Sequence, residues 1–127
     1  MVDHLTDVTS SDSHTVKPWF EGKLDFSPPV PELSMQGFRL AGGRLEFLGK
    51  RPVAAPVYQR REHVINLFMS PAQSATSGDA TMVTRHGYHL AHWRGSGLSY
   101  WAVSNLNQAE LQEFVRAVRQ PTSASPS

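Results

Sequence analysis

The chain has 127 residues, a net charge of +1 and no cysteine. This length is typical of one domain, and a hydrophobic content of 39% is enough for one modest core. The lack of cysteine excludes a disulfide framework, a cysteine nucleophile and thiolate metal sites. The small net charge gives no reason to expect nucleic acid as a partner. No apolar run approaches the roughly 20 residues of a membrane span, and no signal-peptide pattern opens the chain.

Residues 1–31 are expected to form an N-terminal helical arm. Leu5 and Val8, three positions apart in the polar stretch 3–12, predict one or two helical turns. Pro18 suits the first position of a second short helix, with Thr15 as a candidate cap. A helix this short is not stable alone, so its aromatic side must pack on something larger. Docking or interaction candidates in the arm are His14, Lys17, Trp19, Phe20, Leu24 and Phe26.

A proline-rich strap at residues 28–31 ends this segment, and residues 32–36 are a linker or a single turn. Strand-like alternation begins after the linker, in residues 37–48, 53–58, 63–69, 87–93 and 98–103. Gly42 and Gly43 predict a turn or a bulge within the first of these. The stretch 63–69 is apolar on both faces, which predicts a central strand. Pro56 predicts that 53–58 is an edge strand.

An amphipathic helix is predicted at residues 108–119, because its apolar side chains recur at helical spacing. Asn107 and Glu110 have the spacing of a capping box. Residues 72–81 contain no large apolar side chain and predict a mobile loop, and residues 121–127 a disordered tail. The predicted fold class is α+β: an antiparallel meander of about five strands with this helix packed on one face. Residues 32–120 and the arm form a single domain.

The six histidines of the chain are candidates for a metal site. His86, His89 and His92 lie close in sequence, but on a strand His86 and His92 would be about 20 Å apart at roughly 3.3 Å per residue. His89 would point to the opposite face, so these three residues are only an alternative metal site. No serine lies in a Gly-x-Ser-x-Gly elbow, and we expect neither catalysis nor a cofactor. The basic pairs at 50–51 and 60–61 are interpreted as solvated turns rather than a nucleic-acid site.

Several sequence runs carry a family resemblance. The most specific is His-Thr-Val-Lys-Pro-Trp-Phe at residues 14–20, followed by Gly-Lys-Leu-Asp-Phe-Ser-Pro-Pro-Val at 22–30. Further similar runs lie at residues 3–8, 10–13, 37–38, 42–45, 52–55, 57–58, 63–68 and 100–104, and similar single positions at Leu40, Tyr88 and Trp93. From about residue 3 to about residue 114, the chain resembles the extracytoplasmic region of bacterial transmembrane anti-sigma factors.

The resemblance implies a sensory or regulatory domain on the periplasmic side of the inner membrane. In that family a cytoplasmic domain holds an extracytoplasmic-function sigma factor inactive, and one membrane helix joins it to the periplasmic domain. The chain contains neither of those parts, so no sigma-binding residue is assigned. The polar start of the chain would continue the membrane helix. The implied partners are the sigma factor, through that other domain, and a periplasmic regulator or protease.

Two other functions remain open from the residues alone. One is a periplasmic domain that binds a metal or a small ligand without catalysis, and the other is a small hydrolase. A homodimer formed by exchange of the arm, residues 2–31, is also expected, because an edge strand at 53–58 would offer unpaired backbone groups.

Overall fold

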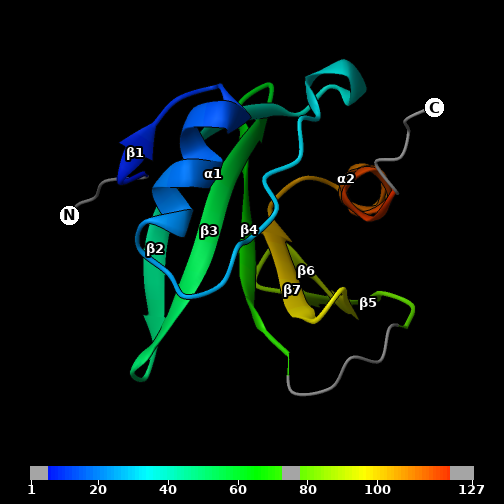
Figure 1. Ribbon diagram of the computed structural model, residues 1–127. Coiled ribbons are helices and arrows are strands. Elements are labelled where there is room, and N and C mark those ends of the chain that lie inside the picture. The colour runs from blue at the N-terminus through cyan, green and yellow to red at the C-terminus, as the bar shows by residue number, and fades with distance from the viewer. Residues whose placement is uncertain (1–5, 73–77, 121–127) are drawn as a thin grey trace.

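The structure of the chain is a computed structural model that describes residues 6–72 and 78–120. Over these residues it has an α+β architecture with one seven-stranded antiparallel sheet (Figure 1). The strands are β1 (Val8–Thr9), β2 (Arg39–Leu48), β3 (Arg51–Arg60), β4 (His63–Pro71), β5 (Thr81–Arg85), β6 (Tyr88–Gly95) and β7 (Leu98–Ser104). The helices are α1 (Ser13–Glu21), the single 3-10 turn η1 (Ser34–Gln36) and α2 (Gln108–Arg119).

The predicted class, the antiparallel sheet and the C-terminal helix are confirmed, whereas the strand count and the simple meander are wrong. The strand order is β1-β2-β3-β4-β7-β6-β5, so β4 pairs with β7 rather than with the next strand in sequence. Two strands were missed. β1 has only two residues, and β5 is mostly exposed, so neither carries a strong apolar pattern.

Two predictions about individual strands have opposite outcomes. β4 lies at the centre of the sheet, as its two apolar faces indicated. β3 is an inner strand, so the prediction that Pro56 marks an edge is wrong. Pro56 is tolerated because the pairing of β3 with β4 is interrupted between Ala54 and Val57, where a proline needs to donate no hydrogen bond. The exposed edge invoked for an arm-exchange homodimer is therefore not β3, and the dimer itself stays a prediction.

The arm differs from its predicted form at both ends of α1. Residues 6–12 contain β1 instead of a helical turn. Helix α1 begins at Ser13 with Asp12 as its cap, whose Oδ1 accepts a hydrogen bond from the backbone of His14 at 2.9 Å. Pro18 therefore lies inside the helix and not at its first position. Its missing N–H would have bonded to the carbonyl of His14, an exposed residue near the helix start, where water can satisfy that oxygen.

Helix α1 packs closely on β2 because the Phe20 ring lies directly against the backbone of Gly43. The pair Gly42–Gly43 lies at a bulge in the ladder between β2 and β3, in agreement with one of its two predicted roles. A Cβ atom built on Gly43 would lie 2.7 Å from the ring of Phe20, so only glycine allows this ring to pack so deeply. Phe20, rather than the half-buried Trp19, is the arm's fully buried aromatic side chain.

The C-terminal helix has its predicted limits and cap. The side chain of Asn107 accepts a hydrogen bond from the backbone of Glu110 at 2.9 Å, which confirms Asn107 as the N-cap, and the Glu110 carboxylate in turn accepts from the side-chain amide of Asn107 at 2.9 Å. Leu111, Phe114 and Val115 are buried against the sheet. Half of the loop predicted at 72–81, residues 73–77, and the whole tail predicted at 121–127 lie outside the described residues. Thr81, the last residue of that predicted loop, is the first residue of β5.

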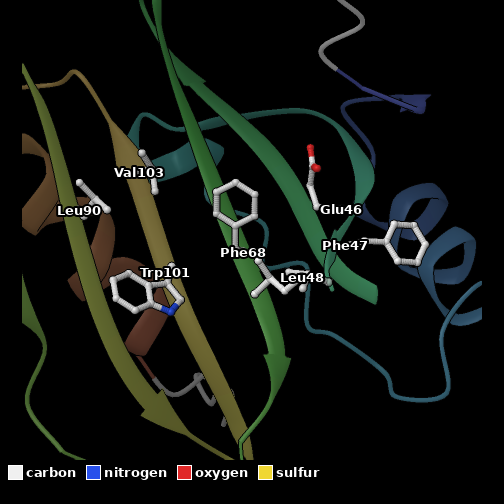
Figure 2. Close-up of a pocket in the computed structure, with 8 residues that line it drawn as sticks. Glu46, Phe47, Leu48, Phe68, Leu90, Trp101 and Val103 are labelled. Carbon is white, nitrogen blue, oxygen red and sulfur yellow. The ribbon is translucent and has the colours of Figure 1, made fainter. Parts of the chain in front are cut away.

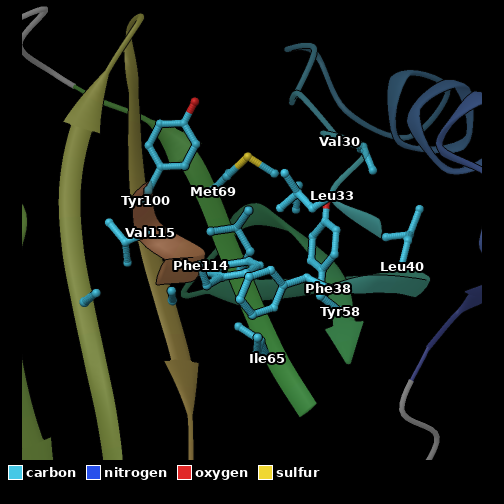
Figure 3. Close-up of a cluster of buried hydrophobic side chains, with 14 of the residues drawn as sticks. Val30, Leu33, Phe38, Leu40, Tyr58, Ile65, Met69, Tyr100, Phe114 and Val115 are labelled. Atoms are coloured by element: carbon cyan, nitrogen blue, oxygen red, sulfur yellow. The ribbon is translucent and has the colours of Figure 1, made fainter. Parts of the chain in front are cut away.

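One core joins both helices to the same face of the sheet. In Figure 3, Phe38, Tyr58 and Phe114 meet at its centre, and the Phe114 ring lies 5.1 Å from Phe38 and 5.3 Å from Tyr58. The Tyr58 hydroxyl donates to the carbonyl of Pro31 at 2.7 Å, which fastens the proline strap over the core, and burial raises the pKa of Tyr58 well above its usual value. We call this side of the sheet the covered face.

Candidate functional site

The second side of the sheet is the main candidate for a functional surface. Successive side chains of a strand point to opposite faces, so the residues between the core positions project away from both helices. Figure 2 looks onto this side, with both helices behind the sheet and Phe68, Trp101, Val103 and Leu90 projecting from β4, β7 and β6. No helix among the described residues packs on it. We call it the open face.

A shallow apolar groove crosses the open face. It has a volume of about 570 Å³ and is lined by Glu46, Phe47, Leu48, Val53, Phe68, Leu90, Trp101 and Val103. Glu46 is the one ionisable side chain among these described residues. The groove therefore offers contact surface rather than acid–base chemistry.

Exposed apolar side chains gather at this groove. Within the described chain, large hydrophobic side chains that are exposed are Met35, Phe47, Leu48, Val83, Tyr88 and Trp101. Phe47, Leu48 and Trp101 line the groove, and pairing places Val83 beside Leu90. Two of the exposed residues lie away from the groove: Met35 is on η1, and Tyr88 is at the start of β6, opposite Arg85. A cluster of this kind on a soluble surface marks an interaction site more often than chance exposure does.

A ladder of ring contacts runs across the strands in the floor of the groove. Trp101 lies directly opposite Phe68 on one side and His92 on the other. The rings of Trp101 and His92 stack with centroids 4.2 Å apart, and the Arg44 guanidinium lies 5.6 Å from the Phe68 ring. The His92 ring also shares a hydrogen bond of 3.1 Å with Ser99. These contacts hold Trp101 in place although 40% of it is exposed.

Burial and charge favour the neutral form of His92. Burial lowers the pKa of His92, and the nearby Arg94 guanidinium lowers it further. A neutral imidazole can stack on Trp101 without bringing a charge into the groove. The aromatic floor therefore keeps its apolar character under ordinary conditions.

The charges of the open face are mostly of one sign. By strand alternation and pairing, its charged side chains are five arginines and one glutamate: Arg39, Arg44, Arg51, Arg85, Arg94 and Glu46. Arg44 hydrogen-bonds both Glu46 and Asn66, which carries it over β3. Arg51, Arg85 and Arg94 are exposed and form no ion pair with the described residues. The groove therefore has an arginine rim.

The docking candidates chosen from the sequence lie away from the groove, in the arm on the covered face. The side chains of Phe20, Trp19, Leu24 and Phe26 pack against the protein's own core. The Lys17 ammonium contacts Glu21 at 3.1 Å, Ser27 at 2.7 Å and the carbonyl of Pro28 at 3.3 Å, closing the arm on itself.

Other arm residues serve the same local fold. The Ser27 hydrogen bond, followed by the Lys17 contacts, lowers the pKa of Glu21. His14 is exposed on α1. These residues hold the arm in place, and a surface for another molecule would have to use the exposed ones.

The three histidines of the alternative metal site are not brought together. His86 lies in the turn between β5 and β6, His89 shares a hydrogen bond of 2.7 Å with Thr84, and His92 stacks on Trp101. Across residues 6–72 and 78–120, no three His, Cys, Asp or Glu side chains converge in a way that could hold a metal ion.

The groove residues were missed in the sequence, although one signal pointed to them. In β7, Leu98, Tyr100 and Ala102 alternate with Trp101 and Val103, so both faces of the strand carry apolar side chains. The one strongly amphipathic helix predicted, α2, can cover only part of one face. An excess of apolar sheet surface over helix surface therefore indicates an uncovered face.

Comparison of the chain with protein-family models, with curated proteins and with solved structures found no match in any of the three. The described helices are also too short or too polar to cross a bilayer.

Proposed function

We propose that this domain is the extracytoplasmic regulatory part of a membrane-anchored anti-sigma factor, and that it acts by binding another protein through the open face. The observation that carries the proposal is the groove with its exposed Leu48 and Trp101 on the open face. Exposed apolar surface is costly in water unless it is covered some of the time. A surface of this kind, built on the inner strands of a sheet, suits a partner that binds and leaves.

The resemblance of residues 14–20 and 22–30 supports the anti-sigma class. In this proposal a cytoplasmic domain, outside the chain, inhibits an extracytoplasmic-function sigma factor, and a membrane helix connects the two. The domain described here lies in the periplasm and changes the activity of the cytoplasmic part. Its periplasmic partner is a regulator or a protease, and the domain itself catalyses nothing.

Deleting the gene in its bacterial host tests this function. We expect transcripts of one group of genes that share a promoter element to rise, because their sigma factor would be released. Complementation with the intact gene should restore the original levels. RNA sequencing of the deletion and complemented strains measures both effects. Unchanged transcripts, or changes scattered over genes without a common promoter element, would contradict the proposal.

A small apolar ligand is the second candidate partner. A volume of about 570 Å³ lies within the range of ligand sites. Such sites enclose most of a ligand, however, whereas the groove is a shallow channel on a sheet, so a protein partner fits it better. Saturable binding of a small apolar compound that raises the melting temperature of the domain would favour this alternative.

A further inference from the structure

The covered face shows how a helix binds to this sheet. Helix α2 places an apolar stripe of Leu111, Phe114 and Val115 on the strands. Carboxylates beside the stripe then pair with sheet arginines: Glu110 and Glu113 lie 3.1 and 3.0 Å from Arg60. Glu110 also lies 2.9 Å from Arg61. The helix is therefore held by an apolar centre and an acidic flank.

The open face presents the same two components without a helix among the described residues. Leu48, Phe68, Trp101 and Leu90 supply the apolar centre. Arg51, Arg85 and Arg94 supply the cations beside it, and none forms an ion pair with the described residues. Pairing places Arg51 and Arg94 toward the same end of the groove, on β3 and β6, and Arg85 toward the other end on β5.

The size of the groove also suits a helix. The strands β3, β4, β7 and β6 are consecutive in the sheet, and at about 4.8 Å per strand they span roughly 14 Å. A helix with its side chains is about 10–12 Å across. One helix would therefore cover Phe68 and Trp101 and bring its flanks near the arginines.

Charge excludes a second copy of this face as the favoured partner. Two open faces packed together would oppose five arginines with five arginines, against a single glutamate on each. Like charges that face each other across an interface oppose binding. The stretches outside the described residues, 1–5, 73–77 and 121–127, contain no glutamate and one aspartate, Asp3, so they cannot supply an acidic flank of several residues.

We infer that the occupant of the open face is an acidic amphipathic helix of a partner protein, with its apolar stripe on Trp101 and Phe68 and its carboxylates at Arg51, Arg85 and Arg94. This inference rests on the proposed function, because it names the chemistry of the partner that the regulatory domain binds. The Trp101 ring is the central anchor, and the arginines select the acidic helix.

Synthetic peptides test the inference on the full chain. Three peptides are used, each about five helical turns long. Two are amphipathic and carry a leucine stripe flanked either by glutamates or by lysines. The third has the composition of the glutamate peptide in an order without a stripe. Each is titrated into isotope-labelled protein, and NMR shifts follow the Trp101 indole and the amides of β4, β6 and β7. We expect only the glutamate-flanked stripe to bind, at least about tenfold more tightly than the other two.

Matched variants separate the two components of binding. Trp101→Gln should weaken binding about tenfold or more, as for a central interface aromatic. The double variant Arg85→Gln/Arg94→Gln should weaken binding and reduce its dependence on salt. Two control variants should leave the affinity within about twofold of the original value. They are Met35→Gln, at an exposed apolar residue away from the groove, and Arg116→Gln, at an exposed arginine of α2. Circular dichroism and denaturation confirm that each variant is folded.

Several results would overturn the inference. Equal binding of the lysine-flanked peptide would refute the role of charge, and equal binding of the unstriped peptide would refute the helix. Full affinity in Trp101→Gln would refute the site. Binding to anionic phospholipid vesicles but to no peptide would identify a membrane surface instead.

The peptide titration and the gene deletion test different claims, so their results distinguish a wrong partner chemistry from a wrong regulatory role. If no peptide binds while deletion of the gene still changes one promoter group, the regulatory role stands and the partner chemistry is wrong. If the acidic peptide binds but the deletion changes no such group, the partner chemistry stands and the anti-sigma role is wrong.

Discussion

Arg60 contacts several separate parts of the fold, and no sequence motif indicated this role. It was interpreted as a solvated turn residue, but its side chain is only 14% exposed. Its guanidinium donates to the carbonyls of Gln36 and Gly37 at 2.7 and 3.3 Å and lies 3.9 Å from the Phe38 ring. It also binds both acidic residues of α2. One cation therefore joins the linker, the sheet and the C-terminal helix.

Replacing Arg60 should therefore cost far more than replacing its neighbour. We expect Arg60→Ala to lower the free energy of unfolding by about 2–4 kcal/mol, because it removes a hydrogen-bond donor from two carbonyls and two carboxylates, of which Glu110 keeps Arg61 as a partner. Arg61→Ala should lower the free energy of unfolding by less than about 1 kcal/mol, because the Arg61 side chain is 60% exposed. Urea denaturation measures both. Equal losses for the two arginines would contradict the role given to Arg60.

At the scale of elements, the arm depends on a glycine in the strand beneath it. Gly43 of β2 leaves the space that the Phe20 ring of α1 occupies, with Val16 at the same contact. The arm motif and the Gly42–Gly43 pair are therefore parts of one packing arrangement, although more than 20 residues separate Phe20 from Gly43. This explains why a glycine pair within a strand is compatible with a stable sheet.

Gly43→Ala should destabilise the domain by about 1–3 kcal/mol, as for an overpacked core. Adding Phe20→Leu, which removes the clashing end of the ring, should make the double variant less costly than the sum of the single ones. Gly95→Ala is the matched control, because a Cβ atom there meets nothing within 4 Å. Thermal unfolding of the four variants measures the coupling. Strict additivity would show that the ring and the glycine do not share this space.

The sequence correctly predicted the elements that are determined by neighbouring residues, such as helix caps and hairpin turns. The capping box of Asn107 and Glu110 marked α2, and the turn at Ser96–Gly97, where both residues have positive φ, marked the hairpin of β6 and β7. The pairing of β4 with β7 joins residues about 30 or more positions apart, and no local pattern encodes it. Pro56 misled the prediction because the interrupted ladder that accommodates it is a tertiary feature.

The site was harder to predict than the fold for a similar reason. Tyr100 and Trp101 are adjacent aromatic residues of β7, yet Tyr100 is buried in the core on the covered face and Trp101 is exposed on the open face. Alternation shows that they point to opposite faces but not which face the helices cover. That choice depends on the packing of the whole chain, so the groove was identified only in the structure, while the docking role of the arm residues stays a prediction.

At the scale of the whole molecule, the sheet has two faces with different roles. One is covered by α1, the proline strap and α2 and supplies stability. The other keeps aromatic and apolar side chains exposed beside Arg51, Arg85 and Arg94, which form no ion pair with the described residues, at a cost that folding alone does not explain. Function and stability should therefore be separable by substitution.

The most direct measurement compares Trp101→Gln with Met35→Gln, introduced into the full-length gene in its host. Both residues are exposed and apolar, but only Trp101 lies in the groove. Both variants should fold, with unfolding free energies within about 1 kcal/mol of the original protein. We predict that Trp101→Gln changes the transcripts of the promoter group identified by gene deletion, while Met35→Gln leaves them unchanged. Unchanged transcripts in a folded Trp101→Gln strain would contradict the assignment of the open face as the functional surface.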